Sequence, residues 1–352
     1  MQHQHGGDLE GYRRKYGREP LDFSANVSPL GLPEGVARAA REAVGRSAAY
    51  PDPACRRLRE AISAHDGVPA EDILCGNGAA ELIFRLAAAL RPRRALLTAP
   101  CFYEYEAALT AAGCELEFHA LRPENGFRLT PAILGQIRPG LSAVFLCQPN
   151  NPTGQAAEKP LLLEILRACR DCGAVLALDE CFVPFLDDPA GGSLLEALGE
   201  NENLVLLRAF TKLYAMPGLR LGYALSSGRT LLSAMRAAGQ SWAVSVPAQE
   251  AGVAALQEAD YVRRARALVG AEKPYLRAAL TQAGAAVIGS DANYLFFRSP
   301  DTALCEKLAA RGILLRDCGN FRGLGPGYCR AAVRCHADNR RLAEAVREVL
   351  NG

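Results

Sequence analysis

The chain has 352 residues, of which 49% are hydrophobic and 22% are charged, and 40 Lys and Arg against 38 Asp and Glu give a formal net charge of +2. These fractions are typical of a globular protein and exclude a disordered, collagen-like or coiled-coil chain. A balance so close to neutral offers no broad electrostatic surface for nucleic acid or an anionic membrane, and we expect neither as a partner. The apolar runs are much shorter than the roughly 20 residues that a transmembrane helix needs.

Cysteine usage and the N-terminus indicate the compartment. Twelve cysteines are scattered along a long chain, without the density of a small secreted scaffold. The first ten residues are polar and lack the apolar stretch of a signal peptide. We therefore expect a cytoplasmic protein with free thiols. One Cys-x-x-Cys, Cys169 to Cys172, lies in a helical pattern without a second pair nearby in sequence, so we expect packed helix residues and no metal site.

The first two thirds of the chain alternate between short apolar runs and amphipathic stretches. A polar segment from 1 to 33 precedes the first expected helix and is predicted to act as an arm across another surface. The expected strands are Ala95–Thr98, Ala143–Cys147, Ala174–Leu178 and Leu204–Leu207, and the helical stretches between several of them are Glu81–Leu90, Glu104–Ala112 and Pro160–Cys172. This alternation indicates an α/β fold with a mostly parallel sheet covered on both faces by helices.

The last third has a different pattern. A long helical stretch from Asp260 to Ala283 precedes strands near 293–297, 313–316 and 329–333, with helices near 302–310 and from 338 onward. This order predicts a smaller α+β domain. We expect three parts: an N-terminal arm belonging to the small domain at 1–38, a large α/β domain at 39–245 and the C-terminal small domain at 246–352.

Polar motifs follow the predicted strands in a fixed order. The small residues of Cys75–Ala80 precede a helix, where backbone amides and the helix N-terminus favour an anion. A polar loop, Gln148–Gly154, lies at the sheet edge where α/β proteins bind ligands. Asp179 ends the next strand, and a carboxylate in a cleft there needs a cationic partner. Lys212 follows a later strand among apolar and aromatic neighbours, which could desolvate its amine and make it nucleophilic.

This order of motifs resembles the fold-type I pyridoxal-phosphate enzymes of the aspartate aminotransferase superfamily. The resemblance covers nearly the whole chain and is carried by Asn-Pro-Thr-Gly at 151–154, the strand-terminal Asp179, Thr211-Lys212, and Gly-Leu-Arg-Leu-Gly at 218–222. It implies a large domain with a mostly parallel sheet, a smaller α+β domain, and pyridoxal 5′-phosphate as cofactor.

The resemblance also implies roles for the matching residues. Lys212 is the residue expected to bond the cofactor aldehyde, and Asp179 is expected to pair with the pyridine nitrogen. Asn151 is expected to donate to the phenolic oxygen of the ring, and Phe102 to stack on the ring face. The residues expected at the cofactor phosphate are Gly78, Ala79 and Arg220, with Thr211 also counted among the cofactor-binding residues.

The expectation that the protein forms a homodimer rests on Tyr50. In Ala49-Tyr50-Pro51-Asp52 it matches a tyrosine that in relatives reaches the cofactor phosphate of the neighbouring subunit. The match implies a homodimer with shared active sites.

The N-terminus resembles one branch of the superfamily in particular. His5-Gly6-Gly7-Asp8 and the stretch 21–31 look like the L-threonine O-3-phosphate decarboxylases of cobalamin synthesis, which are close relatives of the histidinol-phosphate aminotransferases. The branch implies decarboxylation of L-threonine O-3-phosphate to (R)-1-amino-2-propanol O-2-phosphate. Two arginines of the small domain could hold a phosphate as charge-assisted forks. The expected substrate contacts are His5, Gly6, Asn26, Arg316 and Arg330.

Other functions stay open. Histidinol phosphate also carries a phosphate, so the same arginines would serve a histidinol-phosphate or related aminotransferase. L-serine O-phosphate differs from the threonine compound by one methyl group, which is worth only about 1–3 kcal/mol in a pocket. A regulator without turnover would normally carry an added DNA-binding domain. We do not expect such a regulator, because no stretch of helix-turn-helix size remains outside the enzyme-like part of the sequence.

The sequence departs from the family pattern in two places. Ala209 stands where many relatives carry a Ser or Thr that binds the phosphate, and Cys181-Phe182 replaces the Ala-Tyr usual in the aminotransferases.

Overall fold

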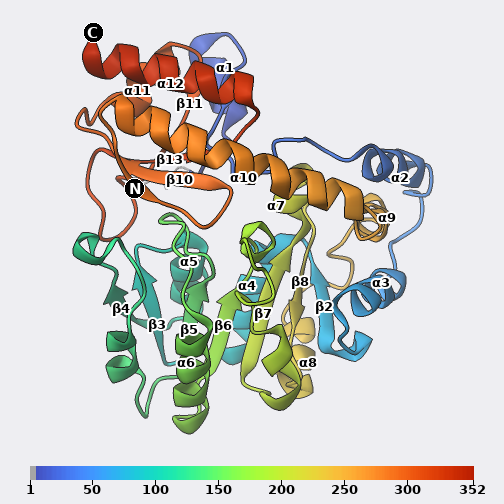
Figure 1. The fold of residues 1–352 in the computed structure, drawn as a ribbon. Coiled ribbons are helices and arrows are strands. Elements are labelled where there is room, and N and C mark those ends of the chain that lie inside the picture. The colour runs from blue at the N-terminus through green and yellow to red at the C-terminus, as the bar shows by residue number, and fades with distance from the viewer. Residues whose placement is uncertain (1–4) are drawn as a thin grey trace.

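Seven strands form the central sheet of the structure, a computed structural model that describes residues 5–352 (Figure 1). Residues 1–4, which begin the expected N-terminal arm, lie outside the described residues. The strand order is β2-β8-β7-β6-β5-β3-β4, and β8 alone runs antiparallel to the other six strands of this sheet. The strands are β2 (Ile73–Gly76), β3 (Arg94–Ala99), β4 (Glu115–Ala120), β5 (Ala143–Cys147), β6 (Val175–Asp179), β7 (Leu204–Ala209) and β8 (Gly222–Leu225).

Helices cover both faces of this sheet. Apolar side chains of α4, α5 and α8 pack onto one face, and those of α3, α6 and α9 onto the other. Strands buried on both faces need no polar alternation, which explains the continuous apolar runs of the sequence. The expected fold class is confirmed. The helices of this part are α2 (Glu34–Val44), α3 (Arg56–Asp66), α4 (Gly78–Leu90), α5 (Tyr103–Ala111), α6 (Lys159–Asp171), α7 (Phe210–Leu213), α8 (Arg229–Ala237) and α9 (Val246–Ala255).

A second, antiparallel sheet lies above the carboxyl ends of the central strands, with helices on its outer side (Figure 1). Its order is β12-β13-β10-β9, and a separate parallel pair joins β1 to β11. The strands are β1 (Leu21–Asp22), β9 (Ala286–Gly289), β10 (Tyr294–Arg298), β11 (Ile313–Leu314), β12 (Arg316–Asp317) and β13 (Tyr328–Ala332). The helices are α10 (Ala259–Gln282), α11 (Leu304–Ala310) and α12 (His336–Asn351).

The N-terminal segment contains a helix that the sequence analysis missed. α1 spans Leu9–Tyr16, although no helix was expected before residue 33. The Asp8 side chain caps it by accepting a hydrogen bond of 2.9 Å from the Gly11 amide, and Gly17 ends it in the left-handed conformation. Buried Tyr12 donates a hydrogen bond of 2.6 Å to the Ala309 carbonyl, so the helix packs on the small domain.

The parts of the chain expected to be domains are joined by shared packing. The N-terminal strand β1 pairs with β11, whereas α9, which follows residue 245, packs on α2 and α3. The boundaries at 38/39 and 245/246 stay predictions. Within residues 5–352, no helix combines the length and apolar character needed to cross a membrane.

Candidate active site

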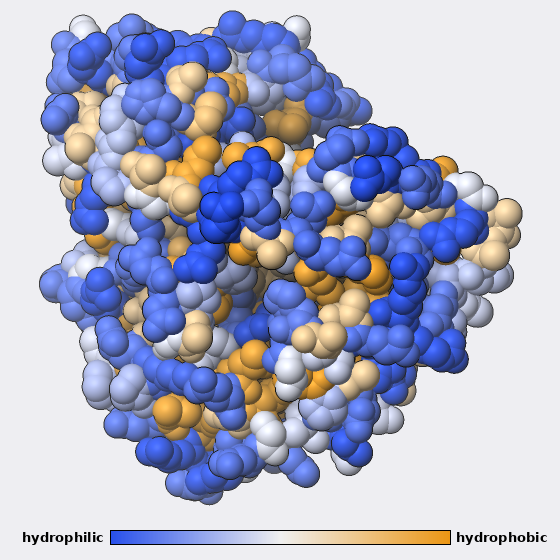
Figure 2. Space-filling model, turned by 45° about the vertical axis from the view of Figure 1, so that its right-hand side comes forward, coloured by the Kyte–Doolittle hydropathy of each residue, from blue (hydrophilic) through white to orange (hydrophobic). Residues whose placement is uncertain are grey.

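A cavity of about 1150 Å³ lies between the central sheet and the small domain. Figure 2 shows one face of the molecule, with its surface hollowed between the two parts. The walls come from both parts: Asp179 ends β6, Lys212 lies in α7 after β7, and Arg330 lies on β13. Residues that are far apart in sequence therefore meet at the edge of the sheet where parallel strands end.

Asp179 is a buried carboxylate with neutral hydrogen-bond donors. Its side chain is 5% exposed; Tyr105 donates to Oδ2 at 2.6 Å, and the Cys181 amide donates to Oδ1 at 3.0 Å. Burying a charge without a cationic group is costly. The site therefore suits a ligand that presents a protonated nitrogen to Asp179.

Lys212 brings an amine into the same cavity. Its Nζ lies 5.8 Å from the centre of the Phe182 ring. Burial is the main cause that lowers the pKa of the Lys212 side chain, and the positive charge of Arg330 lowers this pKa further. A lowered pKa favours the neutral, nucleophilic amine.

An anion cradle lies at the start of α4. Gly78 has φ +80°, and a Cβ at this position would lie 2.8 Å from Nη2 of Arg220, so the guanidinium sits directly against the helix N-terminus. A Cβ at Gly222 would lie 2.5 Å from the amide nitrogen of Ala79, so the close approach of β8 to α4 also requires glycine. Thr211 lines the same cavity. A helix N-terminus, a guanidinium and a hydroxyl together suit a phosphate group.

Two buried guanidinium groups face the cavity from the small domain. Arg316 and Arg330 lie in register on β12 and β13. In the described chain their hydrogen-bond partners are neutral: the Asp317 carbonyl and Asn320 Oδ1 (2.9 Å) for Arg316, and Asn151 Oδ1 and the Ser24 carbonyl (3.0 Å) for Arg330. Burial and the charge of Arg330 lower the pKa of Arg316. Such an uncompensated pair is a site for an anion.

The N-terminal segment lies along the cavity. The Gly7 amide donates a hydrogen bond of 2.7 Å to Ser24 Oγ, and a Cβ at Gly6 would overlap the Ser24 carbonyl oxygen. His5 Nε2 lies 3.0 Å from Glu104 Oε1 of α5. Asn26 also lines the cavity; it is 2% exposed, and neither its Oδ1 nor its Nδ2 has a partner in the described chain. Its amide is therefore free to bind a ligand.

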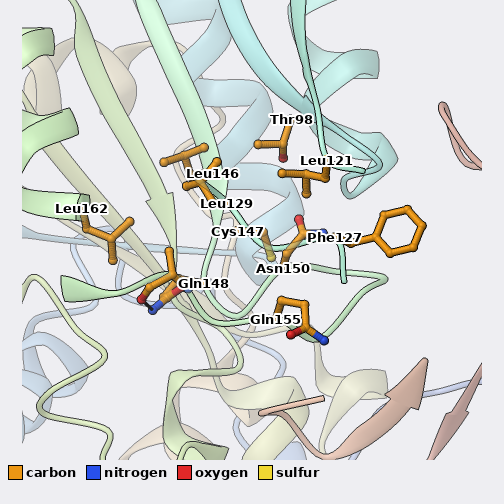
Figure 3. Close-up of a pocket in the computed structure, with 11 residues that line it drawn as sticks. Thr98, Leu121, Phe127, Leu129, Leu146, Cys147, Gln148, Asn150, Gln155 and Leu162 are labelled. Atoms are coloured by element: carbon orange, nitrogen blue, oxygen red, sulfur yellow. Dashed lines mark hydrogen bonds between the residues drawn. The ribbon is translucent and has the colours of Figure 1, made fainter. Parts of the chain in front are cut away.

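The polar loop that carries Asn151 is held by one hydrogen bond within the loop and by two to other elements. Asn150 donates through Nδ2 to the Pro100 carbonyl (3.2 Å) and to Thr153 Oγ1 (2.9 Å), and Tyr294 of β10 donates to the Asn150 carbonyl (2.8 Å). Beneath this loop lies a second cavity of about 20 Å³, far too small for a substrate, into which the Thr98 and Asn150 side-chain oxygens point (Figure 3). The loop thus links the segment before Phe102 to the small domain.

The structure brings together every expected site residue except one. The cavity is lined by His5, Gly6, Asn26, Gly78, Ala79, Phe102, Asn151, Asp179, Thr211, Lys212, Arg220, Arg316 and Arg330. Tyr50 lies outside the cavity of its own chain; it is 79% exposed and stacks on Trp242, with ring centres 4.6 Å apart. Within residues 5–352, no group of three or more His, Cys, Asp or Glu is arranged to hold a metal ion.

Sequence reasoning missed two polar residues that support the site. Tyr105 stands three positions after Phe102, the residue that precedes α5, and the centres of the two rings lie 5.6 Å apart; this spacing was the available signal. Ser24 joins the N-terminal segment to Arg330, and only its place in the stretch 21–31 could have suggested a role.

A central sheet of this order under an antiparallel small domain, with a lysine and a buried aspartate between them, is the aspartate aminotransferase-like fold. The structure of the histidinol-phosphate aminotransferase from Clostridium acetobutylicum matches it with a TM-score of 0.87, covering 94% of this chain and 98% of that one at 26% identity. The model of the family "aminotransferase class I and II" matches residues 18–349. The chain belongs to that family.

Two further relatives share the length of the chain. It is 40% identical to the threonine-phosphate decarboxylase of Salmonella typhimurium, over 99% of this chain and 97% of that protein. The structure of L-threonine-O-3-phosphate decarboxylase from Porphyromonas gingivalis matches with a TM-score of 0.82 and 25% identity, covering 94% of this chain and 99% of that one. The expected membership of the superfamily is confirmed.

The residues present fit pyridoxal phosphate, the cofactor of this family. Asp179 lacks a cationic hydrogen-bond partner, which a protonated pyridine nitrogen would supply. The Arg220 guanidinium lies against the N-terminus of α4 at Gly78, and both line the cavity, which suits the cofactor phosphate. Lys212 lies in the same cavity, and its lowered pKa favours the neutral amine, which is the form that bonds an aldehyde.

Proposed function

We propose that this protein is a pyridoxal-phosphate-dependent decarboxylase of L-threonine O-3-phosphate, which yields (R)-1-amino-2-propanol O-2-phosphate for cobalamin synthesis. The observation that carries the proposal is the buried Arg316 and Arg330 pair, whose partners in the described chain are neutral. The pair supports a phosphorylated substrate. The similarity to the Salmonella enzyme and the His5–Gly7 segment along the cavity favour the decarboxylase within that class.

The cofactor residues would act from fixed elements. The phosphate would be held by Gly78, Ala79, Thr211 and Arg220; Asp179 would keep the pyridine nitrogen protonated, Asn151 would donate to the phenolic oxygen, and Phe102 would cover one face of the ring. When bound, pyridoxal phosphate supplies an electron sink for the electron pair of the broken bond. Lys212 would bond the aldehyde and later deliver a proton from Nζ to the substrate Cα.

The substrate residues would decide which bond breaks. If Arg316 and Arg330 hold the phosphate dianion, with His5, Gly6 and Asn26 closing around it, they are not available to neutralise the substrate carboxylate. The carboxylate then keeps its charge and leaves as carbon dioxide. Binding energy from the remote phosphate would hold the Cα–carboxylate bond in the reactive orientation.

We also propose a cytoplasmic homodimer with shared active sites. Tyr50 is exposed and held by Trp242 outside its own cavity, which suits a residue that reaches the cofactor phosphate of a second copy. All twelve cysteines are free thiols, which supports a reducing compartment.

Product analysis tests the reaction. The purified protein, reconstituted with pyridoxal phosphate and given L-threonine O-3-phosphate, should release carbon dioxide and form the amino-propanol phosphate. Parallel incubations use L-serine O-phosphate, and histidinol phosphate with 2-oxoglutarate. Transamination of histidinol phosphate that is faster than carbon dioxide release would replace the proposal by an aminotransferase, the function named for the structural relative from Clostridium acetobutylicum.

A further inference from the structure

Two thiols of the small domain face each other. Cys305 lies on α11 and Cys329 on β13, and their Sγ atoms are 3.3 Å apart. α11 and β13 pack in the same apolar cluster, so the contact is part of the domain interior. A disulfide has an S–S length of about 2.05 Å, and closing this pair requires the sulfur atoms to approach by roughly 1.3 Å.

The two thiols differ in exposure. Cys305 is partly exposed, whereas Cys329 is 2% exposed. The hydrogen bond with Cys305 and burial together raise the pKa of Cys329 well above the ordinary thiol range. Cys329 therefore keeps its proton, and Cys305 is the thiol that a reagent from solvent meets first. The other hydrogen-bonded pair in the described chain, Cys55 and Cys75, is buried at both positions.

We propose that Cys305 and Cys329 are a modification site, at which exchange with a low-molecular-weight disulfide of the oxidised-glutathione class forms an intramolecular disulfide. The Cys305 thiolate attacks one sulfur of the oxidant, forms a mixed disulfide and expels one thiolate, which takes up a proton. Once Cys305 is in the mixed disulfide, its thiol no longer holds the hydrogen bond that is the main cause raising the pKa of Cys329. Cys329 then gives its proton to solvent and attacks Cys305 Sγ, and the second small thiolate leaves and takes up a proton. Two protein thiols are oxidised, and one small disulfide is reduced to two thiols.

The location gives this bond a consequence for the cavity. The segment between the two cysteines supplies Arg316, Asn320, Phe321 and Arg322 to the cavity wall. Cys329 also directly precedes Arg330, and neighbouring residues of a strand point to opposite faces. The cross-link would therefore fix both ends of one wall of the cavity from behind, without occupying the cavity. This inference does not depend on which reaction the site performs.

Peptide mapping of the full chain with its cofactor tests the proposal. The protein is incubated with oxidised glutathione, free thiols are blocked with N-ethylmaleimide, and the digest is analysed by mass spectrometry. We expect one peptide pair joined through Cys305 and Cys329, which dithiothreitol separates. Cys305→Ser should abolish the pair. Cys172→Ser, which changes another partly exposed cysteine, one that donates to the Cys169 carbonyl, should leave the pair intact.

Two further measurements complete the test. Amide hydrogen exchange over residues 316–324 should slow on oxidation in the wild type and in Cys172→Ser, and stay unchanged in Cys305→Ser. Cys329→Ser should stop at the mixed disulfide on Cys305. Recovery of wild-type Cys305 only as the glutathione adduct, or persistence of the same oxidation-dependent slowing in Cys305→Ser, would overturn the proposal.

Discussion

Tyr105 Oη donates a hydrogen bond of 2.6 Å to Oδ2 of Asp179 and is fully buried. Burial and the neighbouring carboxylate raise the pKa of Tyr105 well above its usual range, so the phenol stays protonated and donates at every working pH. Tyr105 thus holds the carboxylate that would face the pyridine nitrogen.

Tyr105→Phe removes this donor and leaves the ring in place. Because a hydrogen bond to a charged group is worth about 1.5–3 kcal/mol, we expect kcat for carbon dioxide release to fall by about tenfold or more. Cofactor binding, followed by its visible absorbance, should weaken less. Tyr16→Phe on α1, which lies outside the cavity lining, is the matched control. Unchanged kcat would show that the Cys181 amide alone positions Asp179.

Asp179→Asn tests the charge itself. The amide keeps the shape and a hydrogen-bonding group but supplies no negative charge to stabilise a protonated pyridine nitrogen. The expected loss in kcat is about 10²-fold or more, the scale of losing one electrostatic stabiliser. The protein should still bind part of its cofactor, because the cradle at Gly78 and Arg220 is untouched. Near-normal turnover would show that Asp179 does not face the ring nitrogen.

The pKa of Lys212 gives a pH prediction. Bonding to the cofactor aldehyde needs the neutral amine, and burial lowers the pKa, so attachment should proceed below the pH at which an ordinary lysine loses its proton. The positive charge of Arg330 lowers the pKa of Lys212 further, so removing this charge should raise that pKa. Arg330→Met should therefore move the pH profile of cofactor attachment to the cofactor-free protein toward higher pH. Exposed Arg311→Met is the control and should leave the profile in place.

Much of the fold followed from the sequence because its signals are local. β5 was predicted with its observed bounds, since a strand buried on both faces is a continuous apolar run. The edge strand β4, Glu115–Ala120, was missed because polar and apolar residues alternate along it, so it contains no continuous apolar run. α1 was missed because its stability comes from the Asp8 cap and from packing of Tyr12 on the small domain.

The sequence predicted those site residues that belong to recognisable motifs. Motif order named Lys212 and Asp179, and the structure places both in one cavity. No motif could give the contact of Ser24 with Arg330, because the two residues meet only through the packing of the N-terminal segment on β13. Long-range polar contacts of this kind leave no periodic pattern in the sequence.

Mixed dimers test the shared site. Lys212→Ala and Tyr50→Ala should each be nearly inactive alone if Tyr50 reaches the cavity of the other copy. When the two are unfolded together and refolded, half of the dimers are mixed, and each mixed dimer has one intact site, so about a quarter of wild-type activity should return. A mixture of Lys212→Ala and Asp179→Asn is the control for two residues that serve the site of the same chain. In that mixture no dimer has an intact site, so activity should not return. Full activity of Tyr50→Ala alone would remove the assigned role of Tyr50.

Gly6→Ala tests the N-terminal segment without changing any charge. A Cβ at Gly6 would overlap the Ser24 carbonyl oxygen, so the segment must move away from Ser24 and carry His5 with it. Because the segment would close around the substrate phosphate, kcat/KM for L-threonine O-3-phosphate should fall by about tenfold or more, the scale of one lost hydrogen bond to a charged group. Cofactor affinity should stay unchanged, since residues 5–7 are not among the proposed cofactor residues.

Gly270→Ala, on α10 with nothing near its added methyl, is the control and should behave as wild type. Equal losses with L-threonine and its phosphate would place the segment away from the phosphate, and normal kinetics of Gly6→Ala would remove it from the substrate site altogether.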